Sequence, residues 1–215
     1  MHPTLEQKKH RLFLVLSGIF ITNALLAEMI GVKIFSFEQS LGLHPANLNI
    51  LGFTMDFNLT AGVLIWPVVF ITTDLINEYF GKPGVKRISY LTAGLIAYAF
   101  LIIFIAMRLH PADFWHYTKG PDGTSVDMEF AFSKIFGQGQ RIIIGSLTAF
   151  IIGQLTDVYI FQKLKKVTGN KYLWLRSTGS TLISQLVDSF VVLFIAFYGQ
   201  FETKYLIAMC FTNYI

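Results

Sequence analysis

The sequence predicts an all-α integral membrane protein that forms one domain over residues 1–215, with about six membrane-spanning helices. Composition is the first reason, because 53% of the 215 residues are hydrophobic and 14% are charged, against about 25% charged in average soluble domains. The mean hydropathy of +0.55 points the same way. The third reason is a series of apolar runs near 12–35, 59–80, 88–108, 142–161 and 179–198, with a sixth from about 204.

The last apolar run, "YLIAMCFTNYI", is shorter than the roughly 20 residues that cross a bilayer. We expect that the sixth helix is truncated in this chain, or that it only dips into the membrane. Cys210 is the single cysteine, which excludes a disulfide within the chain.

The basic residues predict the orientation of the spans. If six spans alternate, one side of the membrane carries eleven of the 17 Lys and Arg residues. They are Lys8, Lys9, Arg11, Lys82, Lys86, Arg87, Lys163, Lys165, Lys166, Lys171 and Arg176. The positive-inside rule therefore places the N-terminus in the cytoplasm of a multi-pass protein. The same clusters flank apolar runs, which fits a lipid bilayer better than a nucleic acid partner.

The two long segments on the opposite side, 36–58 and 109–141, contain Gly, Pro and Asp and are expected to be loops. Within the second, "MEFAFSKIFGQ" is expected to form a short helix at the membrane interface. Pro67 falls inside the second predicted span, where it would kink the helix. Ser177 or Thr178 is expected to cap the fifth.

A weak similarity between two segments of the chain suggests a 3+3 inverted repeat. "RLFLVLSGIFITNALLAE" (11–28) and "RIIIGSLTAFIIGQLTD" (141–157) both begin with Arg, continue as an apolar run and reach an amide and then an acid. Three spans separate their starts, so the two segments would cross in opposite directions, as in many transporters. Chance similarity between two apolar helices is an equal alternative.

Five acids fall inside predicted spans, and each would cost about 2.5–3.5 kcal/mol at mid-bilayer if it faced lipid. They are Glu28, Asp74, Glu78, Asp157 and Asp188. We therefore expect them to face the bundle interior, a water-filled cavity or polar partners. Glu78 has a simpler alternative, an ion pair with Lys82 four residues later.

Amides accompany these acids at helical spacing. "GQLTD" gives Gln154 and Asp157, "SQLVD" gives Gln185 and Asp188, and Asn77 lies beside Asp74 and Glu78. The alternative is that the groups hold helix to helix, at about 0.6 kcal/mol each. As a lining they would suit a cation, a proton or a planar ring with several N–H groups, on which aromatic side chains can stack.

The sequence favours no enzyme, catalytic residue, metal site or cofactor. The five histidines lie in predicted loops or the N-terminal tail, and neither an H-E-x-x-H motif nor a G-x-S-x-G motif occurs. A Walker motif is also absent from the sequence, so the chain itself carries no ATPase signature.

Three segments carry a resemblance to a known family: "TAGVLIWPVVFITTDLINEYFGK", "GSLTAFIIGQLTDVYIFQKLKK" and "LWLRSTGSTLISQLVDSFVVLFIAFYG". Together they resemble the queuosine precursor transporter family, also called the vitamin-uptake-transporter-like family. The resemblance implies a single transmembrane transporter domain in the bacterial inner membrane that imports 7-deazaguanine bases, in cyano or aminomethyl form. The alternative is a vitamin-binding membrane subunit that needs a separate energising module.

The acid-bearing motifs of that family match this chain at the polar positions above. We therefore expect the substrate to be held by Asp74, Asn77, Glu78, Gln154, Asp157, Gln185 and Asp188. Small residues at Gly94, Gly145 and Gly153 would allow close helix contacts, either within the chain or in a homo-oligomer.

Overall fold

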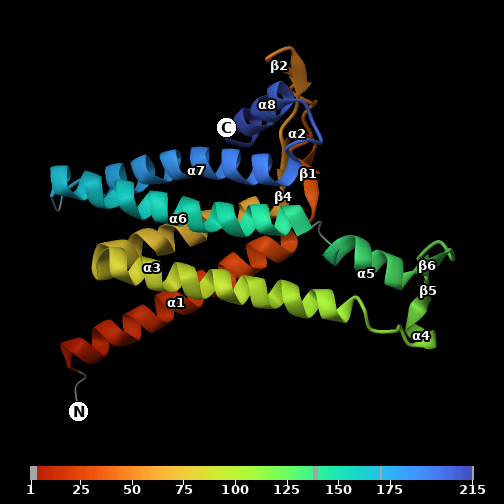
Figure 1. Ribbon diagram of the computed structural model, residues 1–215, viewed down its shortest axis with the longest axis horizontal. Helices are drawn as coiled ribbons and strands as arrows, with labels where there is room; N and C mark the ends of the chain where they lie inside the picture. Colours follow the sequence, from red (N-terminus) through yellow and green to blue (C-terminus); the bar gives the residue numbers. More distant parts are fainter. Residues whose placement is uncertain (1–3, 138–139, 170, 215) are drawn as a thin grey trace.

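A computed structural model describes residues 4–137, 140–169 and 171–214 and shows a bundle of long helices (Figure 1). Within these residues, four helices are long and apolar enough to cross a membrane. They are α1 (Leu5–Ile30), α3 (Trp66–Ala106), α6 (Gln140–Thr168) and α7 (Leu173–Phe197). The helix α8 (Thr203–Tyr214) has 12 residues. The mostly helical class is thus confirmed, with these four helices of membrane-spanning length. The finer count of about six spans stays a prediction.

Helix α3 is two helices joined at Gly81, whose φ of 65° and ψ of −171° are not helical. Figure 1 shows the ribbon of α3 reversing its direction at this bend. Glycine adopts positive φ without the clash that a Cβ causes, and Pro83 follows where a helix start tolerates it. The bend separates the segments that the sequence predicted as spans 59–80 and 88–108.

The start of α3 corrects the prediction for Pro67. Residues 58–64 form a short strand and a 3-10 turn, so the α-helix begins at Trp66 and Pro67 occupies its first turn. A proline there removes no intrahelical hydrogen bond, because the first N–H groups of a helix have no partner within it. Pro67 therefore starts the helix and does not kink it.

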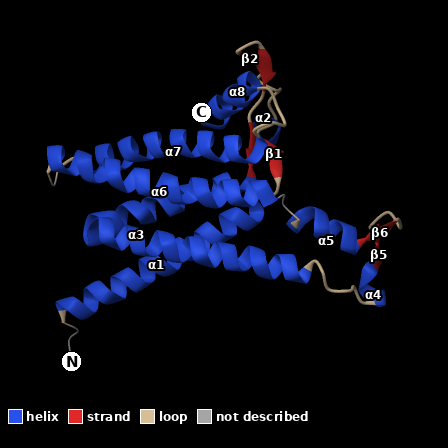
Figure 2. Ribbon diagram, viewed as in Figure 1, coloured by secondary structure: helices blue, strands red, loops and turns tan. Residues whose placement is uncertain are grey.

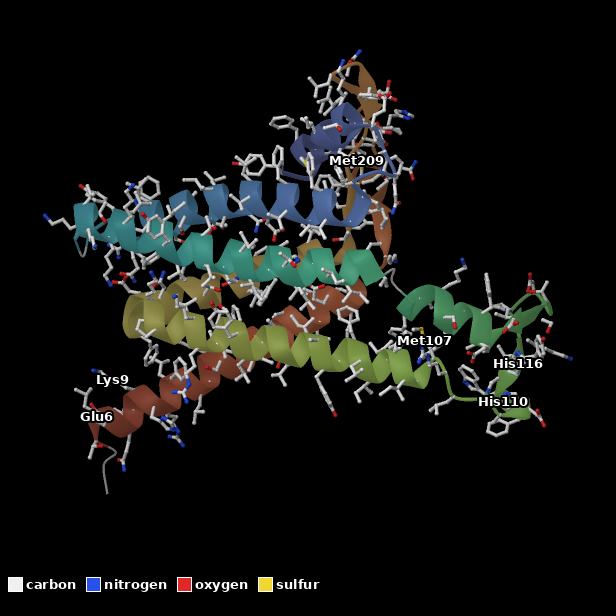
Figure 3. All side chains as sticks on the ribbon, viewed as in Figure 1. Glu6, Lys9, Met107, His110, His116 and Met209 are labelled. Carbon is white, nitrogen blue, oxygen red and sulfur yellow. The ribbon has the colours of Figure 1, made fainter. Side chains whose placement is uncertain are left out.

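The predicted basic segments lie together at one end of the bundle. In Figure 1 the N-terminus, the bend of α3 and the connection from α6 to α7 are all at the left. Figure 3 shows Glu6 and Lys9 at this end, and His110 and His116 at the opposite end. The same arrangement puts the two long connecting segments at the right, as alternation of the spans predicts.

These two segments hold the short strands, which Figure 2 shows in red. The first contains β1 (Ile34–Ser36), α2 (Phe37–Ser40), β2 (Leu48–Ile50), β3 (Phe53–Met55), β4 (Asn58–Thr60) and η1 (Ala61–Leu64). β1 pairs antiparallel with β4, and β2 with β3. The second contains α4 (Asp113–His116), the β5 (Tyr117–Lys119)–β6 (Ser125–Asp127) hairpin and α5 (Met128–Phe136). The predicted short helix is therefore confirmed, and the loop prediction missed the three strand pairs.

Hydrogen bonds to the Glu38 carboxylate stabilise the first connecting segment. Its Oε1 atom accepts hydrogen bonds from the backbone N–H of Phe57 at 2.8 Å and of Ala46 at 3.4 Å, and its Oε2 accepts from Ser36 at 3.2 Å. The hydrogen bond from Phe57 is the largest cause that lowers the pKa of Glu38 below its usual 4.5. The ionised form is therefore the one that the fold stabilises.

Of the three glycines expected to allow close helix contacts, Gly145 and Gly153 lie at a contact between helices of this chain. A Cβ at Gly145 would lie 3.2 Å from the carbonyl oxygen of Val192, and one at Gly153 would lie 3.4 Å from Oδ1 of Asp188. Both glycines thus let α6 approach α7 closely. A Cβ at Gly94, in contrast, would meet open space.

Candidate functional site

A small pocket, with a cavity volume of about 40 Å³, opens between α3, α6 and α7. Its walls combine aromatic rings with polar side chains: Trp66, Phe70, Phe150, Gly153, Gln154, Ser184, Gln185 and Asp188. Such a mixture, with a few convergent polar groups in an apolar wall, is typical of sites for small molecules. The pocket is therefore the candidate binding site.

The aromatic wall comes from two helices. Trp66 and Phe70 lie one turn apart on α3 and stack at 5.7 Å between ring centroids, with 25° between their planes. Phe150 of α6 lies 6.2 Å from Trp66. The three rings form a surface on which a flat heterocycle can stack.

The polar wall comes from α6 and α7. Gln154 is 3% exposed, and its Oε1 accepts a hydrogen bond from Thr73 at 3.2 Å, so its amide NH₂ is the group free to meet a ligand carbonyl. Asp188 lies against Gly153, where the missing side chain leaves room for the carboxylate. A carboxylate beside two amides offers several acceptors and a few donors to one planar ring.

Glu28 at the end of α1 adds a second acid near this wall. Its Oε2 accepts from the hydroxyl of Ser146 at 2.5 Å, and its charge repels that of Asp188. Two like charges in a low-dielectric region are costly unless one is neutralised or a donor comes between them. A ligand with adjacent N–H groups would relieve that repulsion.

Asp74 and Asp157 form a second acidic pair outside the pocket lining. They are 6% and 1% exposed. Ser177 donates a hydrogen bond to Oδ2 of Asp74, and Ser184 donates to Oδ1 of Asp157 at 3.5 Å. Ser177 was expected to cap α7, but α7 begins at Leu173, so Ser177 lies inside the helix with its hydroxyl toward α3.

Glu78 belongs to an ionic cluster at the basic end of the bundle. Its Oε2 lies 3.0 Å from both Lys165 Nζ and Arg176 Nη2. Arg176 is 1% exposed and also donates to the carbonyl oxygens of Gly169 at 2.5 Å and Lys171 at 3.0 Å. The expected Glu78–Lys82 pair is wrong, because cations from α6 and α7 neutralise Glu78 instead.

The structure thus divides the seven predicted site residues among four places. Gln154, Gln185 and Asp188 line the pocket. Asp74 and Asp157 form the pair beside it, and Glu78 belongs to the ionic cluster. Asn77 is fully buried and accepts from Gln162 Nε2 at 2.6 Å. Asp74 and Asp157 are buried, whereas Glu28, Glu78 and Asp188 are half-buried. The acids do not share one chamber.

Sequence reasoning missed the aromatic wall and Ser184. A signal for the aromatic residues was present, because Trp66, Phe70 and Asp74 repeat every four residues and so share one helix face. Ser184 directly precedes Gln185 in the "SQLVD" motif. Arg176 precedes the predicted fifth span, 179–198, but lies inside α7.

Comparison with known proteins matches a family described as "Putative vitamin uptake transporter" to residues 60–215. A "Probable queuosine precursor transporter" of Bacillus subtilis (strain 168) is 28% identical over 173 residues, which cover 79% of this chain and 71% of the relative. The "Queuosine precursor transporter" of Escherichia coli (strain K12) is 30% identical over 144 residues, 67% of this chain and 58% of the relative.

A third relative, a "Probable queuosine precursor transporter" of Haemophilus influenzae (strain ATCC 51907 / DSM 11121 / KW20 / Rd), is 28% identical over 176 residues, 78% of this chain and 66% of the relative. The chain therefore spans less than two thirds of the length of two of these relatives. No solved structure gives a significant match. Because the family profile covers well over half of the chain, this multi-pass membrane protein belongs to the vitamin uptake transporter family, whose curated relatives include queuosine precursor transporters.

Proposed function

We propose that the protein imports 7-deazaguanine precursors of queuosine across the bacterial inner membrane, in cyano or aminomethyl form. The observation that carries the proposal is the pocket between α3, α6 and α7, where aromatic rings face a carboxylate and two amides. A guanine-like edge presents adjacent ring and exocyclic N–H groups beside a carbonyl. Asp188 would accept from the N–H groups, and Gln154 and Gln185 would meet the rest of the polar edge.

The proposed topology has six spans, with the N-terminus in the cytoplasm. The bend of α3 at Gly81 supports counting its two halves as separate crossings. The clustering of the basic segments at one end of the bundle supports the orientation. The inverted repeat stays a prediction, because the similarity between the two segments alone supports it.

Uptake of labelled precursor by bacteria that cannot synthesise it tests the function. Cells with the wild-type chain should accumulate the base, and Asp188→Asn should lower the initial rate by about tenfold or more, since a charge-assisted hydrogen bond contributes about 1.5–3 kcal/mol. Asp113→Asn is the matched control, because Asp113 lies in the exposed segment of α4. Equal rates for the Asp188→Asn and wild-type proteins would contradict this use of the pocket.

The vitamin-binding subunit is tested by reconstituting the purified chain alone into liposomes. We expect uptake without any partner protein, which would contradict a subunit that needs a separate energising module. Binding of the base without uptake would instead support the subunit. Binding itself is measured as ligand-dependent thermal stabilisation, because a ligand that binds only the native state raises its apparent stability.

A further inference from the structure

Asp74 of α3 and Asp157 of α6 have an arrangement that substrate binding does not explain. Both are more than nine-tenths buried, and their charges repel one another. Each carboxyl uses one oxygen to accept from a serine of α7. The other oxygens, Oδ1 of Asp74 and Oδ2 of Asp157, have no hydrogen-bond partner among the described residues.

The surrounding charges do not neutralise this pair. On the inner side, Glu78 of α3, Lys165 of α6 and Arg176 of α7 pair with one another. On the pocket side, Asp188 of α7 and Glu28 of α1 add further negative charge. No ion pair in the described part of the chain includes Asp74 or Asp157. Two ionised carboxylates would cost several kcal/mol in such a place.

We propose that Asp74 and Asp157 together hold one proton, and that this proton enters the cell with the substrate. The second part rests on the proposed transport function. A proton binds to a single carboxylate oxygen, and the pair has two such oxygens without a partner, Oδ1 of Asp74 and Oδ2 of Asp157. A metal ion such as Ca²⁺ takes six or more oxygen ligands, and within the described residues no three His, Cys, Asp or Glu side chains lie together as a metal site.

One hydrogen bond links the pair to the pocket, and a second lies beside the pair. Ser184 lines the pocket and donates to Asp157. Thr73, adjacent to Asp74 in sequence, donates to the pocket residue Gln154. The hydroxyls of Ser180 and Thr181 also lie near the Asp157 carboxyl, without giving its Oδ2 atom a hydrogen bond. A base that competes for Ser184 would thus change a donor available to the pair.

The position of the pair also suits a coupled cycle. Along α7, Asp188 and Ser184 lie on the pocket side, Ser177 is two turns further inward, and Arg176 closes the inner end. The proton would pass from water on the outer side to a carboxylate oxygen of the pair. It would leave to water on the inner side when the ionic cluster separates. An O–H bond forms at a carboxylate oxygen when the proton arrives from water, and the same bond breaks when the proton returns to water.

The experiment uses the purified chain in liposomes that enclose a pH-sensitive dye. Adding a 7-deazaguanine base outside should acidify the interior, and one proton per base allows a gradient of one pH unit to support about tenfold accumulation at zero membrane potential. Asp157→Asn and Asp74→Asn should abolish acidification and accumulation. Both should keep exchange of labelled for unlabelled base, since neither side chain lines the pocket. Asp122→Asn, in the exposed β5–β6 hairpin, is the matched control and should behave as the wild type.

Infrared difference spectroscopy gives a readout that does not need transport. The wild type should show the C=O band of a protonated carboxyl, and Asp157→Asn or Asp74→Asn should remove it if the variant still binds the base in a thermal-shift assay. The absence of the band in the wild type would overturn the proton site, even if a variant fails to fold.

Two further results separate the inference from the function. Uptake without acidification, or uptake driven by a sodium gradient, would overturn the coupling and leave the transport function standing. If the wild type neither binds nor transports the base, the proposed function fails and the coupling fails with it. The infrared band then still decides whether the pair holds a proton.

Discussion

Asp74 and Glu78 lie one helical turn apart on α3, yet their surroundings are opposite. Glu78 is neutralised by Lys165 and Arg176, each 3.0 Å from its Oε2 atom. Asp74 has a serine donor and a second acid, Asp157, as its neighbours. The chain thus compensates one carboxylate completely and leaves the next one uncompensated over a distance of about 6 Å along the helix axis.

The difference separates structure from function. A compensated charge inside a bundle fixes the packing of the helices that supply its partners, here α3, α6 and α7. An uncompensated buried acid lowers stability and is retained where a ligand or proton completes it. The basic end of the bundle, with the Glu78 cluster, should therefore respond to mutation as a structural unit, and the pocket end as a binding site.

The largest expected effect is at Arg176, because its removal would leave Glu78 less compensated and three oxygen acceptors near the end of α6 without their donor. Arg176→Met should lower the free energy of unfolding by about 3 kcal/mol, the low end for a broken buried pair, since Lys165 remains. The apparent melting temperature in detergent measures this. Lys171→Met, at an exposed position, is the control. A melting temperature equal to the control would show that the cluster is not structural.

The pocket should give the reverse pattern at Trp66, where binding and not stability is lost. Trp66→Ala removes the central ring of the aromatic wall and should weaken binding of the base by about 1–3 kcal/mol, or roughly 5- to 150-fold. Titration of the purified protein with the base measures the change. Trp174→Ala, an exposed tryptophan on α7, should bind normally. Unchanged affinity in Trp66→Ala would remove stacking from the proposed site.

The sequence predicted the helical class, the burial of Asp74 and Asp157 and the shared end of the basic segments, because apolar length and charge near lipid leave few alternatives. It also found three of the pocket residues, since the repeated Gln-x-x-Asp spacing marks one helix face. The sequence did not predict that the acids divide into separate clusters. That division depends on Ser177 and Arg176, which come from another helix and are placed by the start of α7. Contacts between side chains of different helices do not produce a regular spacing in the sequence.

A smaller effect on stability is expected at Gly145, where α6 packs closely against α7. Gly145→Ala would place a Cβ 3.2 Å from the carbonyl oxygen of Val192, which is tighter than ordinary contact and should cost about 1 kcal/mol of stability. Gly94→Ala is the matched control, because its Cβ would meet open space and alanine favours a helix by about 0.8–1.0 kcal/mol over glycine. Equal melting temperatures for the two variants would indicate that α6 and α7 separate easily.

The smallest effect is expected at Glu38, an acid outside the spans that is compensated by backbone N–H groups instead of cations. Because folding lowers the pKa of Glu38 below its usual 4.5, the ionised group stabilises the fold above that value, and the contribution is lost as the pH falls through the folded-state pKa. Glu38→Gln should therefore melt slightly below the wild type near pH 7, and the gap should close below about pH 4. Melting temperatures of both proteins over this range measure the gap, and Glu202→Gln, an exposed acid, corrects for general titration. A gap that widens as the pH falls would show that Glu38 is held in its protonated form, like an acid of the spans, and the contrast between backbone-compensated and uncompensated acids would fail at this position.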